Sequence, residues 1–405
     1  METRNEENVD IRETSCCIVG GGPAGVMLSL FLARRGVRVD LLEAHKDFDR
    51  EFRGDTLHPS TMEVLDHLGL ADRLLEIPHT RLSEIGFETP TSTFTIADFN
   101  DLNTKFPYIT VMPQSAFLDF VVAEARQYEN FTCTMNANVK QLVEENGKCV
   151  GVRYQSPDGW HEVRADVVIA ADGRASRLRK LAGFEPVSSS PPMDVLWLRV
   201  SSRPGDPHDL KFRVRNGHIL VVINRGEFWQ LGYIILKGSY RSVKEEGIEA
   251  FREAIAALAP ELADRVDEIT DWKEITPLNV EANRLKKWHR PGLLFIGDAA
   301  HAMSPVGGVG INIAIGDAVA AANELIDPLL AGDVRETHLA AVQKKRQLVV
   351  RLVQNFQTFL QNRVVKSALH PDQPVKPPFF IHLPLIRQLP ARMIGYGIWK
   401  IGLRD

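Results

Sequence analysis

The segment Gly20–Gly25, with the sequence GlyGlyGlyProAlaGly, constrains the fold of this chain more than any other feature. It follows a short apolar run over residues 15–19 and precedes residues 23–35, where apolar side chains recur at helical spacing. A second apolar run, over residues 37–42, ends at Glu43. The pattern predicts a buried strand, a helix and a second strand parallel to the first, joined by a right-handed crossover.

Glycine is required between such a strand and helix if the turn is to hold a dinucleotide. A Cβ atom would block the turn, the approach of the backbone to a diphosphate, and the packing of helix on strand. The helix N-terminus then offers free N–H groups and a partial positive charge. Glu43 stands where a carboxylate can accept hydrogen bonds from ribose hydroxyls, which favours FAD or NAD over NADP. The residues expected to contact the nucleotide here are Gly20, Gly22, Pro23, Ala24, Gly25, Glu43 and Ala44.

Two later motifs also follow apolar runs that look like buried strands. Residues 172–179, AspGlyArgAlaSerArgLeuArg, come after a run that ends at Ala171. Taken alone, this segment fits a capped helix start, in which Asp172 or Ser176 accepts hydrogen bonds from free backbone amides. The third motif is GlyAspAlaAlaHis at residues 297–301, followed by a glycine-rich turn and helix. A carboxylate there can bind a polyol hydroxyl, and glycine backbone at a helix start can approach the edge of an aromatic ring.

The apolar run over residues 292–297 predicts that the chain returns to its first sheet late in the sequence. The fold class expected is α/β, with a Rossmann-like nucleotide-binding domain, for FAD or NAD, that is discontinuous in sequence. Its expected parts are residues 14–80, 106–185 and 275–330.

A β-rich substrate domain is expected to be inserted into this unit, at residues 81–105 and 186–274. Alternating apolar and polar side chains predict antiparallel strands at residues 193–200, 211–224 and 227–236, with a tight hairpin at Asn224, Arg225 and Gly226.

Residues 331–405 are expected to form a C-terminal helical region and tail, with one long amphipathic helix over residues 336–360. For the apolar, proline-interrupted tail from Pro374, covering the core is favoured over contact with a membrane surface. Residues 1–12 are polar and aperiodic and are expected to be a frayed terminus.

Together the three motifs resemble those of the single-component, FAD-dependent aromatic monooxygenases, the para-hydroxybenzoate hydroxylase-like family. The similarity covers residues 14–330. It also includes residues 53–59, ArgGlyAspThrLeuHisPro, which resemble the family stretch beside the flavin, and Gln114, where the family places Arg or Gln near the cofactor. One departure is Val309, because many members have glutamine between the two glycines at that place.

The resemblance implies a non-covalent FAD bound by all three motifs, and no metal. Beyond the first motif, it implies cofactor contacts from Arg53, Gln114, Asp172, Arg179, Gly297, Asp298, Pro305, Gly308, Gly310, Ile311 and Asn312. The loop expected to face the flavin ring contains Pro305, Gly307, Gly308, Gly310 and Asn312. The second motif is also linked with the nicotinamide nucleotide, for which Arg177 or Arg179 is a candidate phosphate partner.

The implied activity is hydroxylation of an aromatic or other electron-rich small molecule. NADPH or NADH would reduce FAD transiently, O2 would form a flavin C4a-hydroperoxide, and one oxygen atom would pass to the substrate. Water has to be excluded meanwhile, and the β-rich domain is expected to do this. The chain has no second strand-flanked GlyXGlyXXGly segment, so a separate NADPH-binding domain is not expected.

Several polar residues invite a catalytic interpretation that the sequence does not support. His301 is expected to make a structural hydrogen bond, and His218, Trp229 and Tyr233 are expected in the core or on the surface of the substrate domain. No acid or base is therefore assigned.

Composition limits the class of protein further. Lys and Arg number 48 against 52 Asp and Glu, a net charge of −4, so nucleic acid is not an expected partner. Four cysteines without a CysXXCys pair predict neither disulfides nor a zinc site and favour the cytoplasm. No apolar run long enough for a membrane-spanning helix is found.

Three alternatives to a monooxygenase stay open from the residues alone. They are a flavin-dependent halogenase, an FAD-dependent reductase acting on a lipid or prenyl chain, and a flavin-binding protein without catalysis. The TrpXTrpXIlePro segment of tryptophan halogenases is absent. Oxygen uptake with a hydroxylated product separates a monooxygenase from the reductase, and failure of NAD(P)H to bleach the bound flavin would favour the protein without catalysis. The sequence leaves the substrate, the oligomeric state and the choice of NADH or NADPH open.

Overall fold

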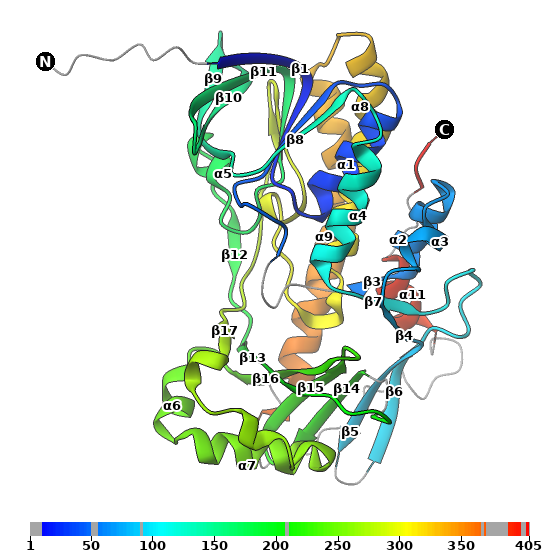
Figure 1. Ribbon diagram of the computed structural model, residues 1–405, viewed down its shortest axis with the longest axis vertical. Coiled ribbons are helices and arrows are strands. Elements are labelled where there is room, and N and C mark those ends of the chain that lie inside the picture. Colours follow the sequence, from blue (N-terminus) through cyan, green and yellow to red (C-terminus); the bar gives the residue numbers. More distant parts are fainter. Residues whose placement is uncertain are drawn as a thin grey trace, which may run out of the picture.

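The computed structural model describes residues 10–49, 56–89, 92–206, 210–365, 368–369, 388–397 and 402–404. Two sheets dominate it (Figure 1). The first has eight strands in the order β19-β20-β11-β1-β2-β8, with β10 paired to β11 and β9 paired to β10. These strands are β1 (Asp10–Val19), β2 (Val39–Leu42), β8 (Phe131–Thr134), β9 (Asn138–Glu145), β10 (Lys148–Ser156), β11 (Gly159–Ala170), β19 (His289–Arg290) and β20 (Leu293–Phe295).

The centre of the first sheet is parallel, as the glycine motif requires. β1 pairs in parallel with both β2 and β11, and β20 pairs in parallel with β11. Strands from three distant parts of the chain thus share one sheet, which confirms the expected α/β class. The expectation that residues 1–12 are a frayed terminus is wrong for the last three, because β1 begins at Asp10, which lies opposite His161 of β11. Residues 1–9 lie outside the described part.

Apolar helices cover the first sheet. Helices α1 (Pro23–Arg34), α4 (Gln114–Ala125) and α8 (Gly310–Leu330) pack together beside it, and α9 (Glu336–Leu360) packs on α8 (Figure 1). By length and composition Val306–Leu330 could cross a membrane, but 78 % of its most apolar window is buried inside the protein. That burial is typical of a core helix.

The second sheet has seven strands in the order β17-β13-β16-β15-β14-β5-β6. They are β5 (Glu84–Thr89), β6 (Ser92–Asp98), β13 (Met193–Ser201), β14 (Leu210–Arg215), β15 (His218–Asn224), β16 (Phe228–Leu236) and β17 (Thr276–Leu278). The predicted strands at 193–200 and 227–236 and the hairpin at residues 224–226 are confirmed, since β15 and β16 pair antiparallel across that turn. The expected single strand over 211–224 is instead two strands, because Asn216 and Gly217 both take positive φ and form a turn.

The two faces of the second sheet have different partners. Alternate side chains such as Leu196, Leu198 and Tyr233 pack with Phe251 and Ile255 of α7 (Ile248–Leu258), on the side away from the first sheet (Figure 1). The other face packs against residues from the turn before α8 and from the C-terminal region.

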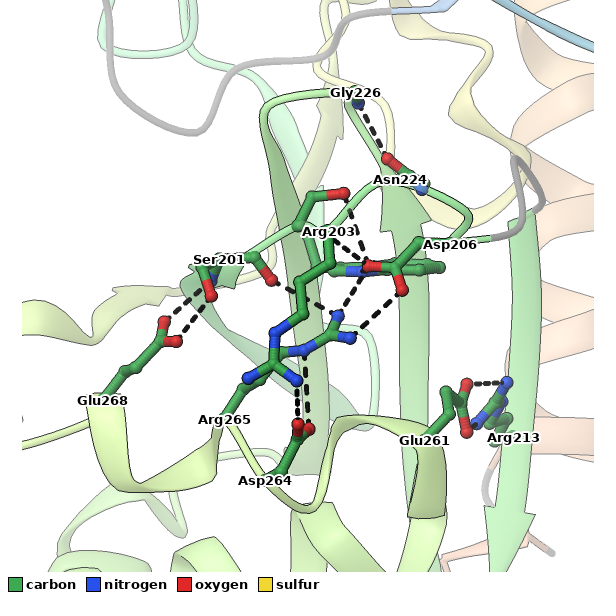
Figure 2. A network of polar contacts seen from close by, with 12 residues as sticks. Ser201, Arg203, Asp206, Arg213, Asn224, Gly226, Glu261, Asp264, Arg265 and Glu268 are labelled. Carbon is green, nitrogen blue, oxygen red and sulfur yellow. Dashed lines mark hydrogen bonds and ion pairs between the residues drawn. The ribbon is translucent and has the colours of Figure 1, made fainter.

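A network of hydrogen bonds and ion pairs joins the second sheet to the short helices that follow α7 (Figure 2). Asp206 accepts hydrogen bonds from the Arg265 guanidinium at 2.6 Å and from the Trp229 indole at 2.7 Å. The hydrogen bond from Arg265 is the main reason that the pKa of Asp206 lies below its usual value. In the same view, Arg213 of β14 pairs with Glu261. These contacts fix the short helices that follow α7 to the sheet.

The remaining elements are short. Strands β3 (Thr56–Leu57), β4 (Thr80–Leu82) and β7 (Ile109–Val111) form a small sheet, and β12 (Val187–Ser189) pairs with β18 (Ala282–Arg284). The helices are α2 (Pro59–His67), α3 (Ala71–Leu74), α5 (Arg177–Leu181), α6 (Tyr240–Glu245), α11 (Leu389–Tyr396), and the one-turn elements η1 (Pro260–Leu262), η2 (Val266–Glu268), η3 (Trp272–Glu274), η4 (Gly297–Ala299), η5 (Val306–Gly308) and η6 (Gln361–Val365). Helix α9 has the predicted bounds. Of the predicted tail, α11 is described, and its Pro390, Ala391 and Gly395 are buried.

Candidate active site at the carboxyl edge of the first sheet

The register of the first sheet brings the predicted motifs together. Val19 lies opposite both Leu42 and Ala170, and Ala170 lies opposite Phe295. The carboxyl ends of these four parallel strands are therefore level, and the loop that follows each one opens at the same edge. This edge is where open α/β sheets bind ligands.

The first glycine loop has the conformation that the sequence predicts. Gly20 has a φ of +110°, and a Cβ atom there would lie 2.3 Å from the backbone oxygen of Ala171. A Cβ atom on Gly25 would lie 2.0 Å from the oxygen of Gly20. At Gly22, the N-cap residue of α1, a Cβ atom would meet no atom of the described residues within 4 Å, and glycine has no side chain with which to cap the helix. Its first N–H groups are therefore available to an anion. Pro23 and Ala24 form the first turn of α1.

Glu43 is tied to the glycine loop. Its carboxylate is buried, with 7 % of the residue exposed, and accepts a hydrogen bond from the Gly21 N–H at 2.8 Å. It also accepts from the His45 N–H at 2.9 Å, and its Oε1 lies 2.6 Å from the His45 Nδ1. The carboxylate thus fixes the conformation of the glycine loop. Ala44 is exposed beside it.

The second motif forms the capped helix start that the residues alone allowed. Asp172 accepts hydrogen bonds from the Ser176 hydroxyl at 2.6 Å and from the Leu178 N–H at 2.9 Å. The Ser176 hydroxyl in turn accepts from the Arg179 N–H. Burial raises the pKa of Asp172 above its usual value despite these bonds.

Arg179 holds the second and third motifs together. Its guanidinium is 6 % exposed as a residue and donates to the backbone oxygens of Ala299 at 3.1 Å and Arg174 at 2.6 Å. Of the two candidate partners for a nicotinamide nucleotide phosphate, the structure leaves Arg177 exposed and uses the Arg179 guanidinium inside the fold. Arg174 also forms an ion pair with Asp298, at 3.1 Å.

A buried ionic cluster lies behind the third motif. Asp317 of α8 accepts from the Gly297 N–H at 3.0 Å, contacts His301 Nε2 at 2.6 Å, and pairs with Arg346 of α9 at 2.7 Å. Burial would raise the pKa of Asp317, but the charges of His301 and Arg346 and their hydrogen bonds keep it below its usual value. The structural role predicted for His301 is confirmed, since it holds Asp317 in place. Sequence analysis did not identify Asp317 or Arg346.

The loop between the third motif and α8 is fixed to β3 and α2. Gly308 has a φ of +62°, and its backbone oxygen accepts a hydrogen bond from the Thr56 hydroxyl at 3.0 Å. The Asn312 side-chain oxygen accepts from the His58 N–H at 2.9 Å and from the Thr61 hydroxyl at 2.7 Å. Its amide nitrogen donates to the Thr56 oxygen at 3.4 Å. The side chain of Asn312 therefore fixes this loop to β3 and α2. The backbone of the loop is then the part that can face a ligand.

The other predicted residues of this loop start α8. Pro305 and Gly307 lie in and beside η5, Gly310 is the first residue of α8, and Ile311 is buried. The N-cap residue of α8, Val309, has no polar side chain to cap the helix, so the N-terminal amides and the positive end of the helix dipole point out at this loop. Gln114 is the first residue of α4. Arg53 lies outside the described residues.

An aromatic surface on the second sheet was not recognised from the sequence. Phe87 of β5 stacks on Phe94 of β6 at 5.7 Å between ring centroids and on Phe212 of β14 at 5.2 Å. Trp197 of β13 lies over Gly232, where a Cβ atom would come within 2.8 Å of the indole. These four side chains, here called the aromatic wall, share one hydrophobic cluster with Val306 of the loop before α8.

The Trp197 N–H has no hydrogen-bond partner among the residues that the structure describes. His218, Trp229 and Tyr233 lie elsewhere, as predicted. Tyr233 and Trp229 are buried on the α7 face, and the Tyr233 hydroxyl contacts His218 at 2.5 Å.

Comparison with known proteins agrees with this geometry. The family described as FAD binding domain matches residues 13–357. Over 409 aligned residues the chain is 34 % identical to 6-methylpretetramide 4-monooxygenase of Streptomyces rimosus, and the match covers 98 % of this chain and 95 % of that enzyme. The chain belongs to the single-component FAD-dependent aromatic monooxygenases. It is accordingly a flavoprotein monooxygenase that uses FAD and NAD(P)H with O2 on a small aromatic substrate.

Solved structures of flavoproteins share the fold of this monooxygenase. p-Nitrophenol 4-monooxygenase PnpA from Pseudomonas putida DLL-E4 superposes with a TM-score of 0.76 at 22 % identity, covering 96 % of this chain and 94 % of that one. The flavin-dependent brominase Bmp2 superposes with a TM-score of 0.75 at 17 % identity, covering 95 % and 93 %. At these identities the likeness concerns the fold alone, which monooxygenases and halogenases have in common.

Proposed function

We propose that this monooxygenase hydroxylates 6-methylpretetramide or a closely related aromatic compound. The observation that carries the proposal is the aromatic wall, which lies in the same cluster as Val306 of the loop before α8. Aromatic side chains favour an aromatic ligand through offset stacking and apolar burial. The alignment with the Streptomyces rimosus enzyme, at 34 % identity, extends over nearly the whole of both chains.

We also propose the residues that bind FAD, and the carboxyl edge of the first sheet fits the group. Gly22 faces open space at an uncapped helix start, Glu43 stands at the end of β2, and Asp298 keeps 28 % of its side chain exposed. Those features suit a diphosphate, a ribose and a ribitol chain respectively. The proposed cofactor residues are Gly20, Gly22, Pro23, Ala24, Gly25, Glu43, Ala44, Arg53, Gln114, Asp172, Arg179, Gly297, Asp298, Pro305, Gly308, Gly310, Ile311 and Asn312. Binding is expected to be non-covalent.

Bound FAD supplies transfer of electrons from NAD(P)H to O2 and of one oxygen atom to the aromatic ring. The protein has to stabilise negative charge near the ring system, which the uncapped N-terminus of α8 does through its dipole. It also has to exclude water, and we assign this role to the aromatic wall, whose side chains share a hydrophobic cluster with Val306 of the loop before α8. The Thr56 hydroxyl, which donates to the Gly308 oxygen, and the His58 N–H, which donates to Asn312, hold the loop that would face the ring.

The organisation of the chain follows from the same proposal. We assign residues 14–80, 106–185 and 275–330 to the FAD-binding domain, residues 81–105 and 186–274 to the substrate domain, and residues 331–405 to the C-terminal region. All four cysteines are free thiols and Cys16, Cys17 and Cys149 are buried. This supports the proposal that the enzyme works in the reducing cytoplasm.

Steady-state turnover with two substrates tests the proposed substrate class. The purified enzyme, loaded with FAD, is supplied with NADH or NADPH and either 6-methylpretetramide or p-nitrophenol. The expected result is a product one oxygen atom heavier from 6-methylpretetramide, with kcat/KM at least tenfold above that for p-nitrophenol. The variant Trp197→Phe should raise KM without loss of FAD, because it removes an N–H that can donate a hydrogen bond to a substrate oxygen. A higher kcat/KM for p-nitrophenol would overturn the assignment.

A further inference from the structure

A buried histidine joins the C-terminal helix to the loop before α8. His58 is 0 % exposed and stands at the start of α2. Its N–H donates to the side-chain oxygen of Asn312 at 2.9 Å, and its Nδ1 lies 2.7 Å from the backbone oxygen of Ile394 in α11. The histidine and Ile394 are 336 positions apart in the sequence.

The contact with Ile394 fixes the protonation of the ring. A carbonyl oxygen only accepts hydrogen bonds, so Nδ1 carries the proton and Nε2 carries the lone pair. The Ile394 carbonyl lies in the last turn of α11, where helix carbonyls lack partners within the helix. His58 therefore supplies a partner for the end of α11. Burial lowers the pKa of His58 to about 4, so the ring is neutral at neutral pH.

The other edge of the ring lies beside Gly308. A Cβ atom built on Gly308 would be 3.8 Å from Nε2 of His58, and 2.9 Å from the Thr56 hydroxyl oxygen. Within the described ranges, Nε2 has no hydrogen-bond partner. The imidazole thus fills the space between α11 and Gly308 without bonding to the loop at that edge.

Gly308 needs such support more than most residues do. Gly307 and Gly308 both have positive φ, at +81° and +62°, and glycine loses more conformational freedom on ordering than other residues. The Thr56 hydroxyl holds the loop on one side of Gly308, and the His58 ring lies on another. Removing the ring would leave a cavity beside the two most adaptable residues of the loop.

A second contact holds α11 without involving this loop. The Tyr396 hydroxyl donates to Glu63 of α2 at 2.9 Å. Tyr396 and His58 therefore both fix α11 to α2, and the His58 ring also lies next to Gly308. Variants at these two residues can therefore distinguish the effect of looser packing of α11 from the effect of losing support for the loop.

We propose that His58 is a positioning residue that transmits the placement of α11 to Gly308, so that the C-terminal helix is part of the oxygenation site. The inference rests on the proposed function of the loop as the segment that faces the flavin. It assigns α11 a role beyond covering the core. Loss of the ring is expected to let the loop relax, with a change in the surroundings of the flavin and more H2O2 released per NAD(P)H consumed.

The test compares three variants in the full-length enzyme with excess FAD. His58→Ala removes the ring and its bond to Ile394, whereas His58→Asn keeps a side-chain N–H for Ile394 and loses the ring edge at Gly308. Tyr396→Phe removes the bond to Glu63 and is the control for loosened packing of α11. The readouts are the absorbance and fluorescence spectra of bound FAD without substrate, the melting temperature, and the ratio of H2O2 to NAD(P)H.

Both His58 variants are expected to shift the FAD spectrum and to raise the H2O2 ratio at least twofold. Tyr396→Phe is expected to lower the melting temperature and leave the other two readouts at wild-type values. If His58→Ala does not fold, the spectrum and the H2O2 ratio of His58→Asn test the proposal. Wild-type spectra and H2O2 ratios in a folded His58 variant would overturn the proposal, and so would equal changes in Tyr396→Phe. Failure of the wild type to bind FAD would instead refute the proposed function.

Discussion

Replacing Asp317 by Asn is expected to destabilise the protein severely. Asp317 is fully buried, and its carboxylate is shared by the Gly297 N–H, His301 and Arg346. Asparagine keeps the size but removes the charge, and it places an NH2 group against groups that donate. The Arg346 side chain, with 4 % exposed, is then left without a counter-charge. Removing one partner of a buried ion pair costs about 3–5 kcal/mol.

The loss of free energy of unfolding can be expressed as a fall in melting temperature, because the unfolding entropy scales with the length of the chain. At about 2.1 cal/mol/K of unfolding entropy per residue, 405 residues give roughly 0.85 kcal/mol/K. The expected fall is therefore about 4–6 °C. Thermal unfolding should be followed for the wild type, Asp317→Asn, Arg346→Met and the double variant, with and without FAD. The double variant should lose less than the sum of the single variants, because it leaves no unpaired charge between these two residues. A fall of about 1 °C or less for Asp317→Asn would refute the claim that this buried pair matters to stability.

Three further outcomes follow from the site. Asp298→Ala and Glu43→Ala should each raise the Kd for FAD by about tenfold to a hundredfold, because a hydrogen bond to a charged group is worth roughly 1.5–3 kcal/mol. Unchanged Kd values in flavin fluorescence titrations would show that the two carboxylates are misassigned. Gly308→Val should lower both the melting temperature and the yield of hydroxylated product, because φ at this residue is +62° and the new Cβ would lie 2.9 Å from the Thr56 hydroxyl. A product yield equal to that of the wild type would show that the loop lies away from the oxygen chemistry. Because the pKa of His58 is lowered from 6.5 to about 4, protonation favours the unfolded chain as pH falls through this window. The free energy of unfolding should fall by about 3 kcal/mol more than in His58→Gln between pH 7 and pH 4, as urea titrations can measure, and equal slopes would contradict the buried neutral ring.

The sequence predicts those parts of the site in which contacts within one short segment explain the identity of its residues. A Cβ atom on Gly25 would lie 2.0 Å from the backbone oxygen of Gly20, five positions earlier, so the identity of this residue is a local requirement that spacing alone predicts. Asp172 likewise bonds to groups four and six positions ahead. The hairpin at residues 224–226 follows in the same way from its turn residues.

The parts that the sequence does not predict depend on contacts between distant segments. Arg346 has the helical spacing of an ordinary amphipathic helix, and only its contact with Asp317 on another helix explains why a charged side chain is buried. The stacking of Phe87 on Phe212 needs the parallel pairing of β5 with β14, across more than a hundred residues. His58 acquires its role from a carbonyl 336 positions away. Periodicity shows which face of an element is apolar, but not which distant element covers it.

The origin of the oxygen atom in the product tests the central claim most directly. The enzyme, loaded with FAD and supplied with NAD(P)H and 6-methylpretetramide, should be allowed to turn over under 18O2 in ordinary water, and the product analysed by mass spectrometry. A monooxygenase incorporates one 18O atom per product molecule, and the label disappears when the gas is 16O2 and the water carries 18O. A product without 18O, or NAD(P)H consumption that yields only H2O2 with every aromatic compound tried, would contradict the account.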